Sequence, residues 1–232
     1  EKEKTEKIRR EFTANVSHEL KTPLTTISGY AQMISNGMAK TEDIKEFGRK
    51  IEKESDRLLT LIDDIINLSN IDEQGSIENP ENIDLSLVTE EAICVLEKAA
   101  KERGIQIYYT KIPTFIKGNV TLVSELVYNL LDNAIKYNKD NGKITVFVGE
   151  SAKGVELSVK DTGIGIPPED TERIFERFYR VDKSHSKKVG GTGLGLSIVK
   201  HVCACHNATI RVKSKVGKGT TIYVTFPNNV NN

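Results

Sequence analysis

The spacing of apolar residues changes near residue 75, where a helical period gives way to short alternating runs. Between residues 1 and 74, apolar positions recur every three or four residues. From residue 75 onward, several segments alternate apolar and polar positions as half-buried strands do. The change predicts two domains, a helical one over 1–74 and an α/β one over 75–232.

The first stretch is expected to form two long helices. At about 100° per residue, one face of the first helix collects apolar residues, namely Phe12, Val16, Leu20, Leu24, Ile27, Ala31 and Ile34. A seven-residue repeat follows in the second helix, at Ile44, Ile51, Leu58 and Ile65, with Phe47, Leu61 and Leu68 between its members. Such a seam packs one helix against another. Asn36-Gly37 interrupts the pattern, which predicts a short turn near 36–41.

A hairpin of two helices buries little apolar surface by itself. Pairing of two chains into a four-helix bundle is the natural way to cover both apolar faces. The sequence therefore predicts a homodimer. A monomeric coiled-coil spacer would also explain the seven-residue repeat, and it is the alternative here.

The second stretch mixes helices and strands without a strict strand–helix–strand alternation. Helices are expected near 86–103, 119–137 and 194–206, and strands near 105–110, 143–149, 154–160, 208–214 and 219–226. Residues 76–82 are expected to be a linker or the first edge of the new domain. The pattern favours the α+β class, a two-layer sandwich with helices on one face of a mixed, mostly antiparallel sheet.

Composition narrows the functional classes. The chain has 33 Lys and Arg against 33 Asp and Glu, so no basic excess indicates nucleic acid or an anionic membrane surface. Three cysteines are too few for a disulfide framework and suit a reducing cytosol. No apolar run is long enough to span a bilayer. A start within an apparent helix suggests that the chain is part of a longer protein.

The first candidate for chemistry is a histidine beside a carboxylate, His18-Glu19. An imidazole nitrogen is a good nucleophile at neutral pH, and the carboxylate can orient the ring and take up its proton. On the helix, His18 lies nearly opposite the apolar face and therefore points outward. Four residues after Glu19, Pro23 lacks an N–H, which predicts a bend below His18. Taken alone, an exposed histidine beside a glutamate is more often plain surface.

Polar residues gather in the second stretch at three places. On the helix near 119–137, an arc of about 80° carries Glu125, Asn129, Asn133 and Lys136, and amides with a lysine suit Mg²⁺ and a polyphosphate. A strand then delivers Asp161, whose carboxylate can accept from an exocyclic amine, before Gly163 and Gly165. A solvated polar face and an ordinary Asp-Thr-Gly turn are the alternatives for these two places.

The third place is a glycine-rich segment, residues 190–196, that leads directly into a helix and can cradle an anion. Its spacing fits neither the Walker motif nor the dinucleotide fingerprint. Before it lie an aromatic and basic segment, residues 175–180, and a polar stretch, residues 182–189. Each block is weak alone, but this order behind an outward His-Glu pair is specific.

With these blocks in view, the chain resembles the cytoplasmic core of bacterial sensor histidine kinases of the HisKA type, with a GHKL-type ATP-binding domain. Residues 17–24, Ser-His-Glu-Leu-Lys-Thr-Pro-Leu, are similar to the H box of that family. The N box of the family resembles residues 129–137, its G1 box residues 161–166, its F box residues 175–180 and its G2 box residues 191–196. After the last helix the family tends to have Gly-Gly, whereas this chain has His206-Asn207, and Asn207 can adopt the left-handed conformation.

The resemblance implies roles for individual residues. His18 would be the phosphoacceptor, Glu19 its orienting base, and Thr22 the residue that places water for dephosphorylation of a partner. Mg²⁺ would be held by Asn133, with Asn129 and Lys136 near the phosphates of ATP. Tyr137 would pack on the adenine and Asp161 would accept from its amine. The remaining nucleotide-binding residues would be Gly163, Gly165, Arg180, Gly191, Thr192, Gly193, Leu194 and Gly195, with a lid over 182–191.

By the same resemblance the chain would be a protein-histidine kinase that uses ATP and Mg²⁺. It would pass the phosphoryl group to an aspartate on the receiver domain of a response regulator, and would dephosphorylate that regulator. Nucleic acid would not be a partner, and a membrane would be reached only through segments outside this chain, leaving these domains in the cytoplasm. Two alternatives are another GHKL ATPase that drives a clamp, and a scaffold without activity. Acid-labile autophosphorylation and nucleotide binding would separate the three.

Overall fold

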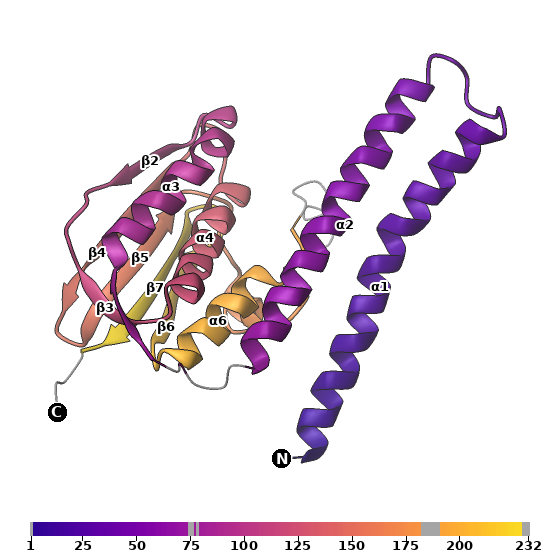
Figure 1. Cartoon of the computed structure of the whole chain (residues 1–232). Helices are drawn as coiled ribbons and strands as arrows, with labels where there is room; N and C mark the ends of the chain where they lie inside the picture. The colour runs from indigo at the N-terminus through magenta and orange to yellow at the C-terminus, as the bar shows by residue number, and fades with distance from the viewer. Residues whose placement is uncertain (1, 74–76, 78, 182–190, 229–232) are drawn as a thin grey trace. The chain divides into compact units, whose positions relative to one another are not determined.

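The computed structural model describes residues 2–73, 77, 79–181 and 191–228 and divides into two compact units. The first unit is Glu1–Asn67 and the second is Leu68–Asn232. Figure 1 shows the helical hairpin of the first unit and the sheet with its helices in the second. None of the described helices carries an apolar stretch long enough to cross a membrane.

Two long helices form the first unit. Helix α1 spans Lys2–Ser35 without interruption, with Pro23 inside it, and α2 spans Ile44–Glu73. The connection is two residues longer than the predicted turn near 36–41. The rings of Tyr30 on α1 and Phe47 on α2 lie 4.9 Å apart, which fixes the pairing of the helices near the turn. The expected antiparallel hairpin is confirmed.

Burial along α2 separates two apolar stripes. The predicted seam is buried at Leu61 and Leu68 and half-buried at most other positions, although Ile44 is exposed. A second stripe, Leu59, Ile62 and Ile66, is exposed at spacings of three and four residues. On α1, Leu24 and Ala31 are exposed as well, whereas the other residues of the predicted apolar face are half-buried, so this face is only partly covered in the single chain.

The second unit is built on two sheets. The larger has the strand order β2-β4-β5-β7-β6 and the smaller pairs β1 with β3. The strands of the second unit are β1 Glu81–Asp84, β2 Gln106–Tyr109, β3 Phe115–Gly118, β4 Lys143–Ser151, β5 Gly154–Asp161, β6 Thr209–Lys215 and β7 Gly219–Pro227. Among the described strands, only the β2–β4 pair is parallel. The predicted mixed, mostly antiparallel sheet is confirmed.

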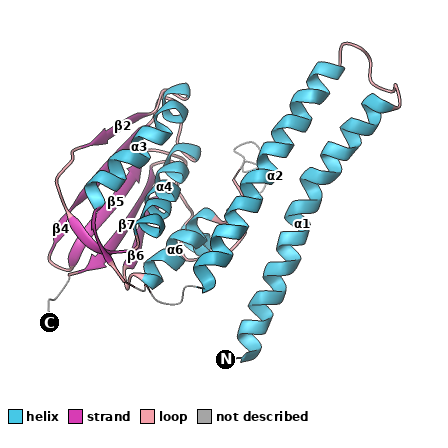
Figure 2. Ribbon diagram, viewed as in Figure 1, coloured by secondary structure: helices cyan, strands magenta, loops and turns pink. Residues whose placement is uncertain are grey.

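Three helices cover one face of the large sheet (Figure 2). They are α3 Leu85–Glu102, α4 Val120–Lys136 and α6 Gly195–Cys205. The strands turn alternate residues toward them, for example Ile144, Val146 and Val148 of β4, all of which are buried. Helices on one side and an open face on the other define a two-layer α+β sandwich, as expected.

The sequence analysis missed strands β1 and β3. Both have four residues and pair only with each other, in the antiparallel register Glu81 with Gly118. The residues 76–82 expected to form a linker or edge therefore end in a strand. Two short 3₁₀ turns, Pro168–Asp170 and Arg173–Phe175, also escaped the periodicity analysis. Neither β1 nor β3 shows an apolar alternation long enough to mark it as a strand, since each is short and only one side chain of each, Ile83 and Ile116, is a buried apolar residue.

After α6 the chain turns back through Asn207, which has φ of 52°. The amide N–H of Ala208 donates to the Cys203 carbonyl over 2.8 Å and closes the helix. The left-handed conformation expected for Asn207 is thus present, and the family's usual glycine is not needed for this helix end.

Candidate active site

The outward histidine lies on α1, with its neighbouring carboxylate bonded to the second helix. His18 is exposed, whereas Glu19 is half-buried. The Nη2 atom of Arg57 on α2 lies 3.4 Å from Oε2 of Glu19, and Nη1 of Arg57 lies 3.7 Å from Glu54. Arg57 therefore orients the carboxylate that stands beside His18. Sequence reasoning missed Arg57, because its pairing depends on the register between the helices.

Thr22 lies one turn beyond His18 on α1 and is exposed. Its hydroxyl donates to the His18 carbonyl over 3.2 Å. The Oγ1 atom retains lone pairs that can accept from a water molecule beside the imidazole. The arrangement places Thr22 where a hydroxyl could orient water near a group attached to His18.

In the second unit, α4 is held at both ends by side chains. Asn119 caps its first turn by accepting from the Leu122 amide over 3.1 Å. At the other end, the Arg103 guanidinium donates to the carbonyls of Ile135, Lys136 and Asn138. A cation on the last carbonyls satisfies them and complements the helix dipole. Arg103 was not singled out from the sequence, because its partners lie more than thirty residues away.

Along α4, the amides of Asn129 and Asn133 have a defined orientation. Nδ2 of Asn129 donates to the Glu125 carbonyl over 2.9 Å, and Nδ2 of Asn133 donates to the Asn129 carbonyl over 2.8 Å. Because each NH₂ group serves as the donor in these bonds, each Oδ1 remains available for a ligand. Amide oxygens are among the ligands that suit Mg²⁺, and this pair fits such an ion.

Lys136, expected near the phosphates, is paired within the same helix. Its Nζ lies 2.6 Å from Oδ2 of Asp132, one turn earlier. Both side chains are largely covered. A phosphate that binds Lys136 must therefore compete with Asp132, a residue that the sequence analysis did not single out.

The N-terminus of α6 lies directly against the two asparagines. A Cβ on Gly195 would stand 2.6 Å from Oδ1 of Asn129 and 3.4 Å from Nδ2 of Asn133. Only glycine allows this approach, which brings the first N–H groups of a helix beside the Asn129 amide oxygen and the Asn133 amide group. Donors for an anion and ligands for a cation thus lie side by side. The pair of features suits a phosphate group with its bound Mg²⁺.

Contacts with the aromatic and basic segment, residues 175–180, hold the rest of the glycine-rich segment in place. The amide of Phe178 donates to the Gly193 carbonyl over 2.9 Å, and a Cβ on Gly193, at φ of 79°, would stand 2.9 Å from the Phe178 Cα. Thr192 accepts from the Leu194 amide at 3.3 Å. The Leu194 side chain is fully buried, so only its backbone can reach a phosphate. Residues 175–180 therefore shape the glycine loop.

Asp161 ends β5 with one oxygen engaged and one open. Oδ1 accepts from the amides of Gly163 at 2.7 Å and Thr220 at 3.1 Å. Among the described residues, no hydrogen bond reaches Oδ2. Burial raises the pKa of this carboxyl above its ordinary value, and the backbone donors of Gly163, Thr220 and Asp161 itself offset only part of the effect. The open oxygen can accept from an amine such as the one on adenine.

Gly163 and Gly165, expected to line the nucleotide, each lie close to the backbone of another segment. A Cβ on Gly163 would stand 2.2 Å from the Tyr137 carbonyl, and one on Gly165, at φ of 72°, would stand 2.2 Å from the Lys215 carbonyl. The amide of Ile164 donates to the same Tyr137 carbonyl over 3.1 Å. Gly163 therefore brings Asp161 and Tyr137, at the end of α4, into one region, whereas Gly165 packs against the end of β6.

A buried network that the sequence analysis missed supports this junction. Asn138 is 4% exposed and its Oδ1 accepts from the Lys139 amide and the Thr162 hydroxyl. The Thr162 hydroxyl oxygen in turn accepts from the Lys143 amide over 2.9 Å. Because a buried amide without partners is costly, this set fixes the turn after Asp161. The only signal in the sequence was an asparagine directly after Tyr137.

The other predicted residues border the same region. Tyr137 caps α4 and is half-buried, and a Cβ on Gly191 would stand 3.3 Å from its hydroxyl. Arg180 and Thr192 are half-buried. The predicted lid, 182–191, lies outside the described residues except for Gly191.

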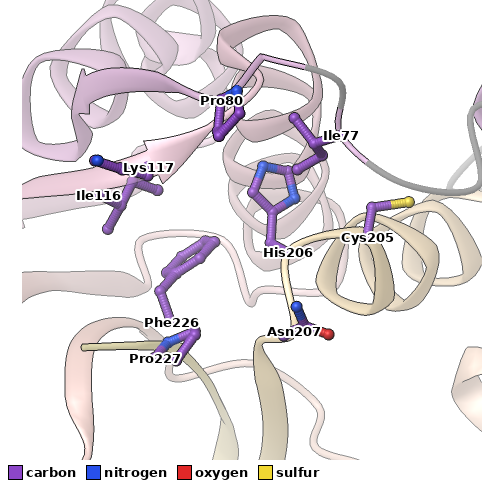
Figure 3. A pocket seen from close by; sticks show the side chains of 9 residues that line it. All are labelled: Ile77, Pro80, Ile116, Lys117, Cys205, His206, Asn207, Phe226 and Pro227. Atoms are coloured by element: carbon purple, nitrogen blue, oxygen red, sulfur yellow. The ribbon is translucent and has the colours of Figure 1, made fainter. Parts of the chain in front are cut away.

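A separate cavity opens at the far end of α6 (Figure 3). Its lining is Ile77, Pro80, Ile116, Lys117, Cys205, His206, Asn207, Phe226 and Pro227. None of these residues was predicted to bind nucleotide. Within it, His206 accepts at Nε2 from the Asn119 amide over 3.2 Å, and Nδ1 then donates to the Val202 carbonyl over 2.8 Å. The ring joins the end of α6 to the start of α4.

Comparison with known proteins agrees with this geometry. Residues 8–74 match the family model described as His Kinase A (phospho-acceptor) domain. Residues 118–230 match the model described as Histidine kinase-, DNA gyrase B-, and HSP90-like ATPase. The second unit therefore has the fold and the nucleotide region of a GHKL-type ATPase.

Relatives and solved structures extend the match over the whole chain. The sensor-like histidine kinase SenX3 of Mycobacterium tuberculosis is 38% identical over 96% of this chain and 54% of its own length. The sensor histidine kinase WalK of Bacillus subtilis is 38% identical over 98% of this chain and 38% of its own length. This chain thus spans about half or less of the length of these relatives.

Two solved structures support the fold. The mycobacterial sensor histidine kinase MprB is 32% identical, with a TM-score of 0.55 over 64% of this chain and 97% of that one. The Acinetobacter baumannii histidine kinase AdeS is 25% identical, with a TM-score of 0.70 over 91% and 98%. The chain belongs to the family of sensor histidine kinases of the HisKA type, with a GHKL ATP-binding domain.

Proposed function

We propose that this chain catalyses ATP-dependent phosphorylation of His18 and transfer of that phosphoryl group to an aspartate of a response regulator. The observation that carries the proposal is the meeting of Asn129, Asn133 and the α6 N-terminus at Gly195. This region can take a triphosphate with Mg²⁺, and the same chain exposes a histidine beside an oriented glutamate.

Binding is assigned to the second unit. Asp161 would accept from the adenine amine through Oδ2, and Tyr137 would lie along the ring. Donors at the start of α6, with Lys136 released from Asp132, would hold the phosphates. Asn133, and Asn129 beside it, would hold Mg²⁺ through amide oxygens, and the bound ion would neutralise charge on the transferred group.

The first step forms a P–N bond and breaks a P–O bond. The unprotonated nitrogen of the His18 ring attacks the γ-phosphorus of ATP, and the bond to the β–γ bridging oxygen breaks, so that ADP leaves. The proton on the other ring nitrogen passes to Glu19, which Arg57 holds in place. In the transfer step His18 is the leaving group, because an aspartate oxygen of the partner attacks the phosphorus and the P–N bond breaks.

The partners are part of the same proposal. A solved structure titled as histidine kinase ThkA in complex with response regulator protein TrrA shares the fold, with a TM-score of 0.77 at 24% identity. We assign a receiver domain as the phosphoryl acceptor, a homodimer as the working form, and Thr22 as the residue that places water for dephosphorylation. These would be the cytoplasmic domains of a membrane-anchored sensor.

The test is incubation with γ-labelled ATP and Mg²⁺, followed by acid or base. Label that is lost in acid and kept in base identifies phosphohistidine. The His18→Gln variant should lose the label and keep its ATP affinity in calorimetry, because the acceptor and the nucleotide region lie on separate units. His201→Gln is the matched control and should label normally. Label on histidine in His18→Gln would contradict the assignment, and ATP hydrolysis without label would identify a clamp-type ATPase.

A further inference from the structure

The face of the large sheet opposite the three helices carries a strongly asymmetric set of side chains. Register places outward residues of neighbouring strands in rows, such as Phe147, Ser158, Tyr223 and Arg211. The next row contains Tyr108, Thr145, Lys160, Thr221 and Lys213. Five strands at about 4.8 Å spacing make this a nearly continuous surface about 19 Å wide.

Charge on this face is segregated although the whole chain is neutral. Five cations point outward, namely Lys143, Lys160, Arg211, Lys213 and Lys215, and all are exposed. The described strands contribute one carboxylate to the face, Glu156, whose Oε2 lies 3.7 Å from Arg211. The face therefore carries four net positive charges within a chain whose formal charge is zero.

Three aromatic side chains lie among these cations. Tyr108 is 49% exposed and Phe147 is 45% exposed. Lys143 Nζ lies 6.0 Å from the Tyr108 ring centre, and the Arg211 guanidinium lies 4.3 Å from that of Tyr223. The Phe147 ring lies over Gly149, where a Cβ would stand 2.7 Å from it. Lysine, arginine and amphipathic aromatic residues are the side chains that favour the boundary between water and lipid headgroups.

Edge protection and base stacking each account for only part of this pattern. Charged residues on an edge strand discourage pairing with another chain, which would explain β6 but not Lys143 of β4 and Lys160 of β5. A sheet with exposed aromatic rings can also stack nucleic-acid bases. Here Arg211 already covers the Tyr223 ring, so that ring offers no cleared platform for a base.

We propose that this open face of the sheet, the surface of Lys143, Lys160, Arg211, Lys213 and Lys215 around Tyr108, Phe147 and Tyr223, docks on a bilayer of anionic phospholipid. Charge complementarity is the argument for this occupant, since a cluster of four or more cations attracts acidic headgroups over about a Debye length. The contact would be reversible and would hold the domain by its open face, with the helices turned away from the lipid.

The test is co-sedimentation of the 232-residue chain with vesicles of phosphatidylcholine, alone or mixed with phosphatidylglycerol. Binding is expected only to the mixed vesicles and should weaken steeply when salt rises from about 50 to 300 mM. Lys160→Glu/Lys213→Glu should weaken it at least about 25-fold, since each cation contributes about fivefold. Lys98→Glu/Lys101→Glu, on α3 across the sheet, should bind like the unmodified chain.

ATP affinity of both variants serves as the measure of folding and should not change. Equal binding to neutral and mixed vesicles would overturn the proposal, and so would an equal loss in the α3 control. A single-stranded oligonucleotide is the second probe. If it binds through Lys160 and Lys213 while anionic vesicles do not, the face is a nucleic-acid surface and the membrane proposal is wrong.

Discussion

Asp161 must be ionised to serve as an acceptor, yet its surroundings favour the proton. Burial raises its pKa, so the folded protein binds this proton more tightly than the unfolded chain does. At pH values above the raised pKa, the ionised carboxylate lowers the free energy of unfolding. Asp161 therefore destabilises the folded protein at the pH values at which it is ionised and could accept from the adenine amine.

The Asp161→Asn variant should separate these two effects. The amide oxygen can still accept from Gly163 and Thr220, whereas its NH₂ would face the adenine amine. A lost charge-assisted bond of about 1.5–3 kcal/mol corresponds to at least about a tenfold loss of ATP affinity. The melting temperature without nucleotide should be equal or higher. Calorimetry and thermal unfolding at pH 7.5 measure both, and an unchanged affinity would mean that Asp161 only shapes its turn.

Thr22 gives a second prediction at this scale. Its hydroxyl lies on the solvent side of α1, one turn from His18, and nothing in the forward step uses it. Thr22→Ala should keep autophosphorylation and transfer while the phosphorylated regulator decays more slowly with ADP present. Thr25→Ala removes a similar hydroxyl bond, to the Lys21 carbonyl, and is the control. Equal decay in all three proteins would contradict the role.

Whether the role of one of these residues can be predicted from the sequence depends on how far along the chain its interaction partners lie. Asn129 and Asn133 share one helix face, so helical period alone brings them together. Arg57, Arg103 and Asn138 act through tertiary partners, and no local pattern marks them. Lys136 was placed correctly on its helix, and Asp132 four residues earlier is a local signal for their pairing that the sequence analysis passed over.

At the scale of elements, the long helices and the alternating strands were predicted to within a few residues. β1 and β3 were missed because pairing with each other, rather than an apolar alternation, makes them strands. The role of the helix ends was missed as well. His206 closes α6 and at the same time accepts the amide of Asn119, which caps α4. The two helices that border the nucleotide region are thus joined at the ends farthest from Gly195.

His206 should make the second unit sensitive to acid. Burial lowers its pKa below the ordinary value of about 6.5, so the unfolded chain takes up this proton first. The contribution of neutral His206 to the free energy of unfolding is complete above about pH 6.5, and it is lost as the pH falls from there toward the lowered pKa. Urea unfolding should show less stability at pH 5.5 than at 7.5.

The matched variant is His206→Gln, which cannot gain a charge. It should be less stable than the unmodified chain at pH 7.5, because a packed ring is lost against Gly118 and Phe226. The further loss of stability of this variant between pH 7.5 and 5.5 should be smaller than that of the unmodified chain. The same pH dependence in both proteins would exclude His206 as its source.

At the scale of the whole molecule, the first unit leaves an apolar stripe in solvent. Leu59, Ile62 and Ile66 of α2 are exposed on one face, and Leu59 is 60% exposed. Such a stripe on a helical hairpin is typical of an interface between chains. The proposed homodimer would bury it.

Leu59→Glu/Ile62→Glu should therefore give a monomer. Two charges in an apolar interface are costly to bury, whereas in a monomer they lie in water. Val95→Glu, at a 70% exposed site on α3, is the control and should stay dimeric. Analytical ultracentrifugation distinguishes the two results. A double variant that remains dimeric would place the interface elsewhere.

The helix around His18 has an unusual set of hydrogen bonds. Hydroxyls of Ser17, Thr22, Thr25 and Thr26 each donate to the carbonyl four residues earlier. Those carbonyls share their lone pairs with the helix amides, and the Glu19 carbonyl has no amide partner because Pro23 lacks an N–H. The shared carbonyls and the missing amide weaken the backbone ladder in this turn of α1. In the proposed mechanism, a weaker ladder here would let the His18 imidazole tilt between the ATP-binding unit and a regulator while the hairpin on either side keeps its shape.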